Sequence, residues 1–292
     1  MAKDISTVVA DIYGLLSGEG SKLSPETSHS LGDDMVFHVD KAISTVKREP
    51  RESGKLWASD IGKPCNLALW KDFHGIEGEV LKGNVKYKFL YGNVVEELTL
   101  HLVRQSGHDV TDEQKRVELF IGGTDWKVSG KIDAVIDNTL VDVKSAASRS
   151  FDKYNKEGVT SANDTFGYRY QLAFYYHFGP ESFRENIPKF LFVDKSLGHV
   201  SLVNVELPTE QEVVAAISEK VTVLGSYYPP PRAYTAVPEG KSGNMKLGTG
   251  CSYCPHKVGC WPGLRAFAYA NGPVFLTEVA NLPKVQEISI EQ

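Results

Sequence analysis

The stretch Val128 to Ala146, VSGKIDAVIDNTLVDVKSA, places ionisable side chains among apolar residues that are typical of buried β-strands. An Asp-Asn turn signal divides it, so the pattern predicts two neighbouring strands. Side chains alternate between the two faces of a strand, so Asp142 and Lys144 project to one side and Val143 to the other. We expect Asp133, on the preceding strand, to lie opposite or diagonal to Asp142.

Two carboxylates held this close repel each other unless a divalent cation or a proton lies between them. Hard oxygen ligands select Mg²⁺ or Mn²⁺ over zinc, and Lys144 would then supply a group for proton transfer or charge stabilisation. The alternative is an ordinary Asp–Lys pair on a surface strand. The apolar flanking residues favour interior strands, where unpaired charges are costly.

The pattern GKID followed by LVDVK resembles the core signature of the PD-(D/E)XK nuclease superfamily. Asp142, Val143 and Lys144 stand in the place of (D/E)-x-K, and Asp133 in that of the upstream metal-binding aspartate. Two further motifs resemble the RecB-like branch of this superfamily.

Gln171 and Tyr175, in QLAFY, resemble the Gln-x-x-x-Tyr element of RecB-type nucleases, which holds DNA near the metals. Their i, i+4 spacing puts both on one face of a predicted helix. Taken alone, the pattern also suits a helix with one buried tyrosine. In YGNVVEEL, the position four residues after Gly92 predicts Glu96 as a further metal ligand. Many RecB-like nucleases have histidine there, and the register leaves Glu97 open as the alternative.

The four cysteines are Cys65 and the C-x2-C-x5-C group of Cys251, Cys254 and Cys260. Four thiolates suit either an iron–sulfur cluster or tetrahedral zinc, and the spacing does not separate them. One remote cysteine followed by three C-terminal ones resembles the iron–sulfur RecB-type nucleases, including CRISPR-associated exonucleases, so the resemblance implies a [4Fe–4S] cluster. Such a site would join distant parts of the chain.

The resemblance implies a fold, a reaction and a set of residues. The fold would be α/β, with a restriction-endonuclease-like core of a mixed sheet flanked by helices, and with N- and C-terminal segments joined by the four cysteines. The metal ligands would be Glu96, Asp133, Asp142 and the Val143 carbonyl, with Lys144 acting on the attacking water and Gln171 and Tyr175 positioning DNA.

The implied activity is that of a Mg²⁺- or Mn²⁺-dependent deoxyribonuclease, an exonuclease rather than an endonuclease, acting on DNA with a single-stranded end. Recombination, repair or bacteriophage DNA metabolism would be its setting, with a recombination protein or a second copy of the chain as partner. Two alternatives stay open: a DNA-binding or assembly subunit with an auxiliary nuclease site, and a zinc-stapled endonuclease of the same fold.

Change of periodicity along the chain predicts its organisation. We expect a helical N-terminal segment at 1–58, a nuclease core at 59–231 and a cysteine-cluster segment at 232–292 that packs on residues around 65. Within the core, a long helix is predicted at 84–105, followed by a β-meander.

The formal net charge of −5 argues against a protein coated with basic residues. It leaves room for a local basic segment at 41–63, which has six basic residues against three acidic ones, as a phosphate-binding or simply solvated face. No secretory signal or membrane-spanning run is seen. These features predict a cytoplasmic protein, in the host cytoplasm if phage-encoded, whose cysteines do not form disulfides.

Overall fold

The computed structural model describes residues 3–20, 22–44, 51–80 and 83–290. The chain divides into two compact units. The first comprises Met1–Arg48, Gly54–Gly62 and Lys82–Ala216, and the second comprises Glu49–Ser53, Lys63–Leu81 and Ile217–Gln292. Residues 63–81, which the sequence assigned to the nuclease core, therefore cluster with the C-terminal segment. Each unit is assembled from segments that are distant in the sequence.

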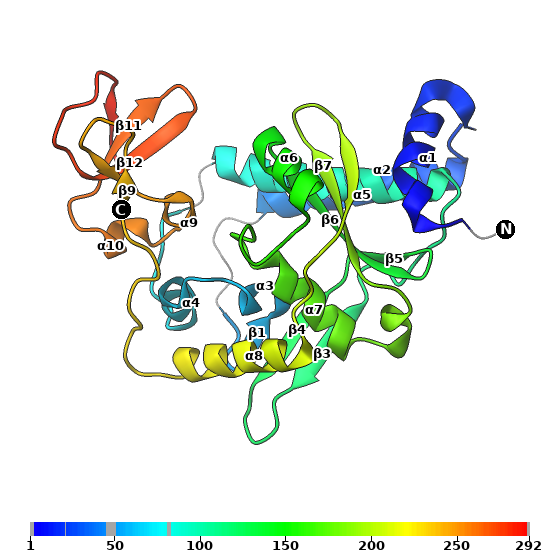
Figure 1. Ribbon diagram of the computed structural model, residues 1–292, viewed down its shortest axis with the longest axis horizontal. Helices are drawn as coiled ribbons and strands as arrows, with labels where there is room; N and C mark the ends of the chain where they lie inside the picture. The colour runs from blue at the N-terminus through cyan, green and yellow to red at the C-terminus, as the bar shows by residue number, and fades with distance from the viewer. Residues whose placement is uncertain (1–2, 21, 45–50, 81–82, 291–292) are drawn as a thin grey trace. The chain divides into compact units, whose positions relative to one another are not determined.

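The first unit contains a five-stranded sheet in the order β2-β5-β6-β7-β8 (Figure 1). Its strands are β2 (Val110–Thr111), β5 (Ala134–Ile136), β6 (Thr139–Ala146), β7 (Lys189–Asp194) and β8 (Val200–Val203). β6 and β7 are parallel, whereas the other neighbours are antiparallel. The prediction of a mixed α/β fold is confirmed. A parallel pair needs a long crossover, and here it contains α6 (Ser148–Glu157), α7 (Tyr168–Phe178) and η3 (Glu181–Arg184).

A second sheet of the first unit has three strands in the order β1-β4-β3. These are β1 (Lys55–Trp57), β4 (Lys127–Lys131) and β3 (Arg116–Phe120). The predicted meander is thus divided between two sheets, because the chain leaves β4 and enters β5 through only Ile132 and Asp133. This passage places Asp133 at the junction of the two sheets.

The remaining helices of the first unit lie mostly in its N-terminal half. They are η1 (Ile5–Thr7), α1 (Val8–Gly14), η2 (Leu15–Glu19), α2 (Pro25–Ser44), α3 (Ala58–Ile61) and α5 (Gly83–Gln105). α5 matches the helix predicted at 84–105. The helix α8 (Glu210–Leu224) begins in the first unit and ends in the second.

The five-stranded sheet has an aliphatic face and an aromatic face. On the aliphatic face, Val141 and Val143 of β6 belong to a buried cluster with Val8 and Ile12 of α1 and Leu100 and Val103 of α5. On the other face, Phe190 and Phe192 of β7 contact the rings of Tyr168 in α7 and Tyr154 in α6, with centroids 6.2 and 4.8 Å apart. Burial of both faces explains why β6 reads as an almost continuous apolar run.

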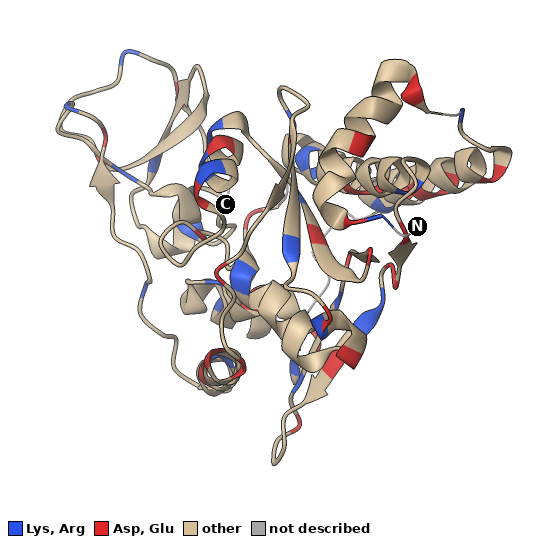
Figure 2. Ribbon diagram, turned by 45° about the vertical axis from the view of Figure 1, so that its right-hand side comes forward, with Lys and Arg blue, Asp and Glu red and all other residues tan. Residues whose placement is uncertain are grey.

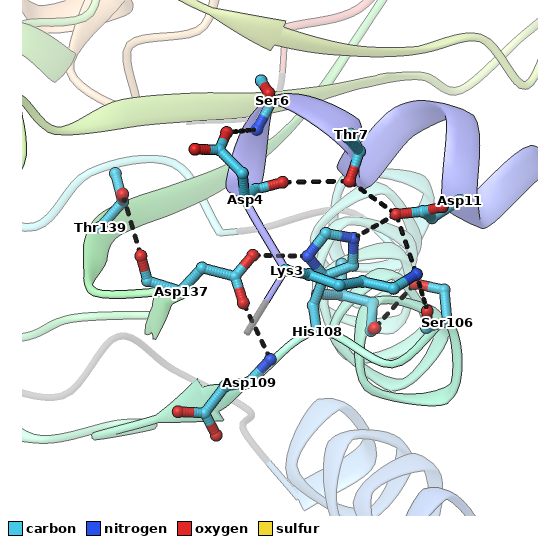
Figure 3. A network of polar contacts seen from close by, with 11 residues as sticks. Lys3, Asp4, Ser6, Thr7, Asp11, Ser106, His108, Asp109, Asp137 and Thr139 are labelled. Carbon is cyan, nitrogen blue, oxygen red and sulfur yellow. Dashed lines mark hydrogen bonds and ion pairs between the residues drawn. The ribbon is translucent and has the colours of Figure 1, made fainter. Parts of the chain in front are cut away.

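A buried histidine ties the N-terminal helices to this core (Figure 3). His108 follows α5, and its side chain is fully buried. Its Nε2 lies 3.0 Å from Asp11 of α1, and its Nδ1 lies 2.5 Å from Asp137 in the β5–β6 turn. Within the segment 1–58, which lay outside the family resemblance, helix α1 therefore contributes part of the first unit's core.

The second unit is built around a small antiparallel sheet in the order β13-β11-β12-β10-β9. Its strands are β9 (Val237–Pro238), β10 (Met245–Lys246), β11 (Arg265–Tyr269), β12 (Gly272–Glu278) and β13 (Glu287–Ile288). Its helices are α4 (Asn66–Phe73), α9 (Thr249–Ser252), α10 (Lys257–Cys260) and the end of α8.

Acidic and basic residues are interspersed along both units, and neither sign covers a unit alone (Figure 2). This distribution agrees with the modest net charge. Among the described residues, no helix combines the length and apolarity that crossing a bilayer requires.

Candidate active site

Asp142 and Lys144 lie on the central strand β6 and face the aromatic side of the sheet. Their register partners on the parallel strand β7 are Phe190 and Phe192, and residues paired in this way project to the same face. Asp142 is buried, and the side chain of Lys144 is 20% exposed. The alternation expected from the sequence therefore holds, and it directs both charges into a largely apolar layer.

Asp133 lies opposite Asp142, just outside the paired part of the strands. β5 pairs with β6 through Ala134 and Val141, and one further step of this antiparallel register joins Asp133 to Asp142. The backbone N–H of Val143 donates to Asp133 Oδ2 at 2.7 Å. Asp133 thus continues the register of β5, and its carboxylate lies against the backbone of β6.

The ammonium of Lys144 lies among three oxygens at this edge. Its Nζ forms an ion pair with Asp142 Oδ2, and it lies 3.9 Å from Asp133 Oδ2 and 3.4 Å from the carbonyl oxygen of Val143. These are three of the four oxygen donors that the family resemblance implies for a metal. In the structure a cationic group therefore occupies the centre of the expected ligand set.

Glu96, and not Glu97, belongs to this group of charges. The carboxyl group of Glu96 interacts electrostatically with Lys144, Asp142 and Asp133. Glu97 instead lies 3.2 Å from His38 of α2. The structure thus separates two adjacent glutamates that the sequence register left open.

Burial and mutual repulsion keep these carboxyl groups from ionising as they would in water. Burial raises the pKa of Glu96 to about 7, and the nearby Asp142 adds to the rise while Lys144 opposes it. Burial and the charge of Asp142 raise the pKa of Asp133 well above its ordinary value, and burial also raises the pKa of Asp142. Three acids around one ammonium leave excess negative charge that a further cation would neutralise.

Gln171 and Tyr175 of α7 reach the same region. Gln171 Nε2 lies 3.5 Å from the hydroxyl of Tyr175. Burial raises the pKa of Tyr175, while its hydrogen bond to Gln171 opposes this rise and the nearby charge of Asp142 adds to it. A Cβ added to Gly130 of β4 would lie 2.4 Å from that hydroxyl. The glycine of the GKID pattern therefore leaves the space in which Tyr175 sits.

The start of α7 is fixed by two local features. Asp164 accepts hydrogen bonds from the backbone N–H groups of Gly167, Tyr168 and Arg169 at 2.8–2.9 Å, which satisfies donors that a helix end leaves unpaired. Gly167 has a φ of +80°, and an added Cβ would lie 2.3 Å from the backbone of Gly62. This close approach holds α7, with Gln171 and Tyr175, against α3.

Tyr168 is a neighbour of the site that the sequence did not single out. Lys144 Nζ lies 5.6 Å from the centroid of its ring, within the range of a cation–π contact. Burial raises the pKa of Tyr168 to about 12, so its hydroxyl stays protonated. The helical spacing from Tyr168 to Gln171 and Tyr175 was the available signal, but several other tyrosines nearby masked it.

The second unit brings the four cysteines together. Cys65 is the N-cap of α4, Cys251 lies in α9, Cys254 follows α9, and Cys260 ends α10. Burial raises the pKa of Cys254 to about 11, and the other three thiols add to this rise through their charges. The remote cysteine and the C-terminal three are thus close enough to interact.

Polar contacts around the cysteines join the same two segments. Lys71 Nζ donates to Cys260 Sγ at 3.1 Å, and His256 Nε2 lies 2.8 Å from Asp72 Oδ1. The backbone N–H of Glu79 donates to the carbonyl oxygen of Pro255 at 2.8 Å. Residues 65–79 and 251–260 are therefore joined by polar contacts in addition to the proximity of the cysteines.

Ligand atoms close enough to share one metal ion occur at a different position in the first unit. Among the described residues, only Asp34, Glu97 and His101 form a group of three His, Cys, Asp or Glu ligand atoms within 4.8 Å of one another. The acids around Lys144 do not form such a group among the described residues. The thiols also do not form one, although tetrahedral zinc with bonds of about 2.3 Å would hold sulfurs closer than this limit.

The basic segment at 41–63 is only partly described, since residues 45–50 lie outside the described part of the chain. Two of its cations contact aromatic rings. Lys55 lies 4.3 Å from the ring centroid of Trp57, and Arg51 lies 5.6 Å from that of Phe73. Both cations thus contact aromatic rings, and the proposed phosphate-binding role of this segment stays a prediction.

Comparison with known proteins adds little to this geometry. No family model matches the chain, and no curated protein matches it significantly. A solved structure titled "Crystal structure of SSO0001" is similar over 81% of this chain and 96% of its own length, with 16% identity and a TM-score of 0.48. Function is therefore inferred from the residues of the site.

Proposed function

We propose that this protein is a metal-dependent deoxyribonuclease with a RecB-like PD-(D/E)XK core. The observation that carries the proposal is the position of the Lys144 ammonium among Asp142, Asp133 and the Val143 carbonyl, with Glu96 beside them. These residues come from a helix, a strand and the junction of two sheets, whereas the sequence predicted a helix and two neighbouring strands.

The residues fit a divalent cation in charge and in donor type. Glu96, Asp133 and Asp142 carry three acids against the single charge of Lys144, and all the donors are oxygens. Asp142 Oδ2 is buried and has no hydrogen-bond partner among the described residues, apart from its ion pair with Lys144. Such a set suits Mg²⁺ or Mn²⁺. When bound, the ion would supply a Lewis acid that stabilises negative charge on a phosphate.

Lys144 would orient the attacking water and stabilise negative charge. In the metal-free protein its ammonium holds its proton too tightly to act as a base. Burial alone would lower the pKa of Lys144, but the carboxylates of Asp142 and Asp133 outweigh this effect and raise it. Hydrolysis forms a new P–O bond from water and breaks the ester P–O bond. The attacking water loses one proton to solvent, and the leaving oxygen takes one up. A fixed ammonium next to these oxygens lowers the cost of the charge that develops.

Gln171 and Tyr175 would position the DNA strand. Their polar groups meet at one point on α7, within reach of the charges of Asp133 and Asp142. The amide can donate or accept hydrogen bonds, and the phenol stays protonated and can donate to a phosphate oxygen. Phosphate contacts of this kind fix the register of a strand without reading its sequence.

For the second unit we infer a [4Fe–4S] cluster on Cys65, Cys251, Cys254 and Cys260. The thiols interact electrostatically, yet no three of them meet the spacing for one ion within the described residues. Four thiolates suit both kinds of site, and the order of one remote and three C-terminal cysteines, which resembles iron–sulfur RecB-type nucleases, favours the cluster. Iron and sulfide analysis of anaerobically purified protein tests this inference, and one bound zinc without iron would contradict it.

From the family resemblance we further propose DNA with a single-stranded end as the substrate and exonucleolytic cleavage as the reaction. A cytoplasmic role in recombination, repair or phage DNA metabolism would follow. These finer points rest on resemblance and not on site geometry.

The decisive experiment is degradation of 5′- and 3′-labelled single- and double-stranded DNA with Mn²⁺ or Mg²⁺. We expect the wild type to release short products from DNA ends. The cleavage rate of Lys144→Ala should be about a hundredfold to a thousandfold lower. Lys153→Ala, which removes an exposed lysine of α6, is the matched control and should cleave normally. Equal cleavage by Lys144→Ala and the wild type would refute the site assignment. DNA binding without any cleavage would favour the assembly-subunit alternative.

A further inference from the structure

A second cluster of ligand-type residues lies between α2 and α5 of the first unit. α2 carries Asp34 and His38, and α5 carries Glu97 and His101. Each pair has i, i+4 spacing, which places both members on one face of their helix. Each helix therefore presents one acid and one imidazole to the other.

The four side chains contact one another across the interface. His101 Nε2 lies 3.1 Å from Asp34 Oδ2, and His38 Nε2 lies 3.2 Å from Glu97 Oε1. One ligand atom each from Asp34, Glu97 and His101 lies within 4.8 Å of the other two. Donors this close can share one ion after only small side-chain movements.

We propose that Asp34, Glu97 and His101 bind a divalent transition-metal ion, with zinc as the best match. Two carboxylates and one neutral imidazole balance the charge of a divalent ion. Mixed oxygen and nitrogen donors suit zinc, whereas the all-oxygen set around Lys144 suits Mg²⁺ or Mn²⁺. Three protein ligands leave a fourth position, which water can fill.

The burial of these side chains favours a binding site over two separate interhelical ion pairs. The side chain of His101 is 4% exposed, and that of Asp34 is 41% exposed. The site is thus anchored inside the protein and open to solvent on the side of Asp34. His38 lies beside the site, with its Nε2 facing Glu97 and its Nδ1 buried without a hydrogen-bond partner among the described residues.

Arg104 would have to adjust when the ion binds. Its Nη1 lies 3.3 Å from His101 Nδ1, and its Nη2 pairs with Glu113. Ligation through His101 Nε2 moves the ring proton to Nδ1, which no longer accepts from Arg104. The guanidinium keeps its ion pair with Glu113, so the arginine charge stays paired when the hydrogen bond to the His101 ring is lost.

The ion would clamp α2 onto α5 and would not take part in DNA cleavage. Glu97 and Glu96 are adjacent, yet they belong to different clusters. This inference therefore stands or falls separately from the nuclease proposal. Metal binding can be measured without any DNA substrate.

The test is Zn²⁺ titration by calorimetry on the full-length, cluster-loaded protein in an Asp142→Asn background. We expect one site whose affinity falls at least about tenfold in Asp34→Asn and in His101→Ala. The exposed neighbour Asp33 provides the matched control, since Asp33→Asn should bind as tightly as the background. Zinc X-ray absorption should show nitrogen and oxygen ligands at about 2.0–2.1 Å without sulfur.

Asp34→Asn changes a partly exposed side chain, so it is expected to fold even if His101→Ala does not. Unchanged zinc stoichiometry and affinity in Asp34→Asn would overturn the proposal, as would a sulfur shell around the bound zinc. Arg104→Ala sharpens the test, because removing the competing donor should tighten zinc binding. Weaker binding in that variant would contradict the proposed ligation through His101 Nε2.

Discussion

Two faces of helix α5 carry adjacent glutamates with different partners. Glu96 meets Asp133, Asp142 and Lys144 at the edge of β6, and burial raises its pKa to about 7. Glu97 meets His38 of α2 at 3.2 Å. Successive helical residues are rotated by about 100°, which is enough to send two identical side chains to different neighbours.

The difference shows that residue type alone does not set the chemistry of a carboxylate. Around Glu96 the acids outnumber the single ammonium, and the donors are oxygens. Around Glu97 each acid faces an imidazole. The first environment requires an added cation or protons to be stable, whereas the second is balanced and can either stay as it is or take up a softer ion.

Replacing each of the two glutamates in turn by glutamine is the strongest test of this contrast. Glu96→Gln should reduce Mn²⁺-dependent DNA cleavage by about three orders of magnitude, because it removes a metal-binding oxygen charge. Glu97→Gln should change the rate by less than about tenfold. Single-turnover cleavage at saturating Mn²⁺ measures both. A larger loss in Glu97→Gln would reverse the assignment.

A substitution in the second unit should leave both faces of α5 unchanged. Cys251→Ser should remove iron and sulfide and lower the melting temperature by roughly 5–10 °C, because a cluster ligand between distant segments is lost. The Mn²⁺ affinity of the Lys144 site should not change. Calorimetry and metal analysis check this, and Tyr253→Phe, at an exposed position between Cys251 and Cys254, is the control. An unchanged melting temperature would contradict a stapling role for the cysteines.

The smallest expected effect is a pH dependence of the metal-free protein. The pKa of Glu96 rises from 4.5 to about 7 on folding, so the folded protein holds this proton more tightly than the unfolded chain. Its contribution to stability is therefore fully present below pH 4.5 and is lost as the pH rises to about 7. We expect a loss of about 1–3 kcal/mol over this range.

Urea unfolding of the metal-free protein at pH 5 and pH 8 measures this loss. Glu96→Gln should abolish the Glu96 part of it and make the protein more stable at pH 8, and Mn²⁺ should restore stability to the wild type. Glu97→Gln should weaken this dependence without abolishing it, because the charge of Glu97 adds to the rise in the pKa of Glu96. A Glu96→Gln variant that is less stable than the wild type at pH 8 would show that this carboxylate is not under electrostatic strain.

Much of the framework followed from local patterns. Helix α5 was readable from its periodicity and its Ser-Gly stop, and β6 from its apolar run, because both signals depend on near neighbours. The convergence of Asp142 and Lys144 followed from strand alternation. The division of the predicted meander into two sheets did not, since it depends on how Gly130 and Tyr175 pack and on where Asp133 turns.

By itself, the sequence determined helix α5, strand β6, the common face of Asp142 and Lys144 and the grouping of the three C-terminal cysteines, because these depend on short-range spacing. The strands β9 to β13 of the second unit were not predicted. Only the tertiary structure decided between Glu96 and Glu97, placed Tyr168 beside Lys144 and brought Asp34 to His101. These decisions depend on which helix face meets which neighbour, and packing between distant segments sets that choice. The N-terminal segment shows the same limit, since α1 joins the core through contacts with residues about a hundred positions away.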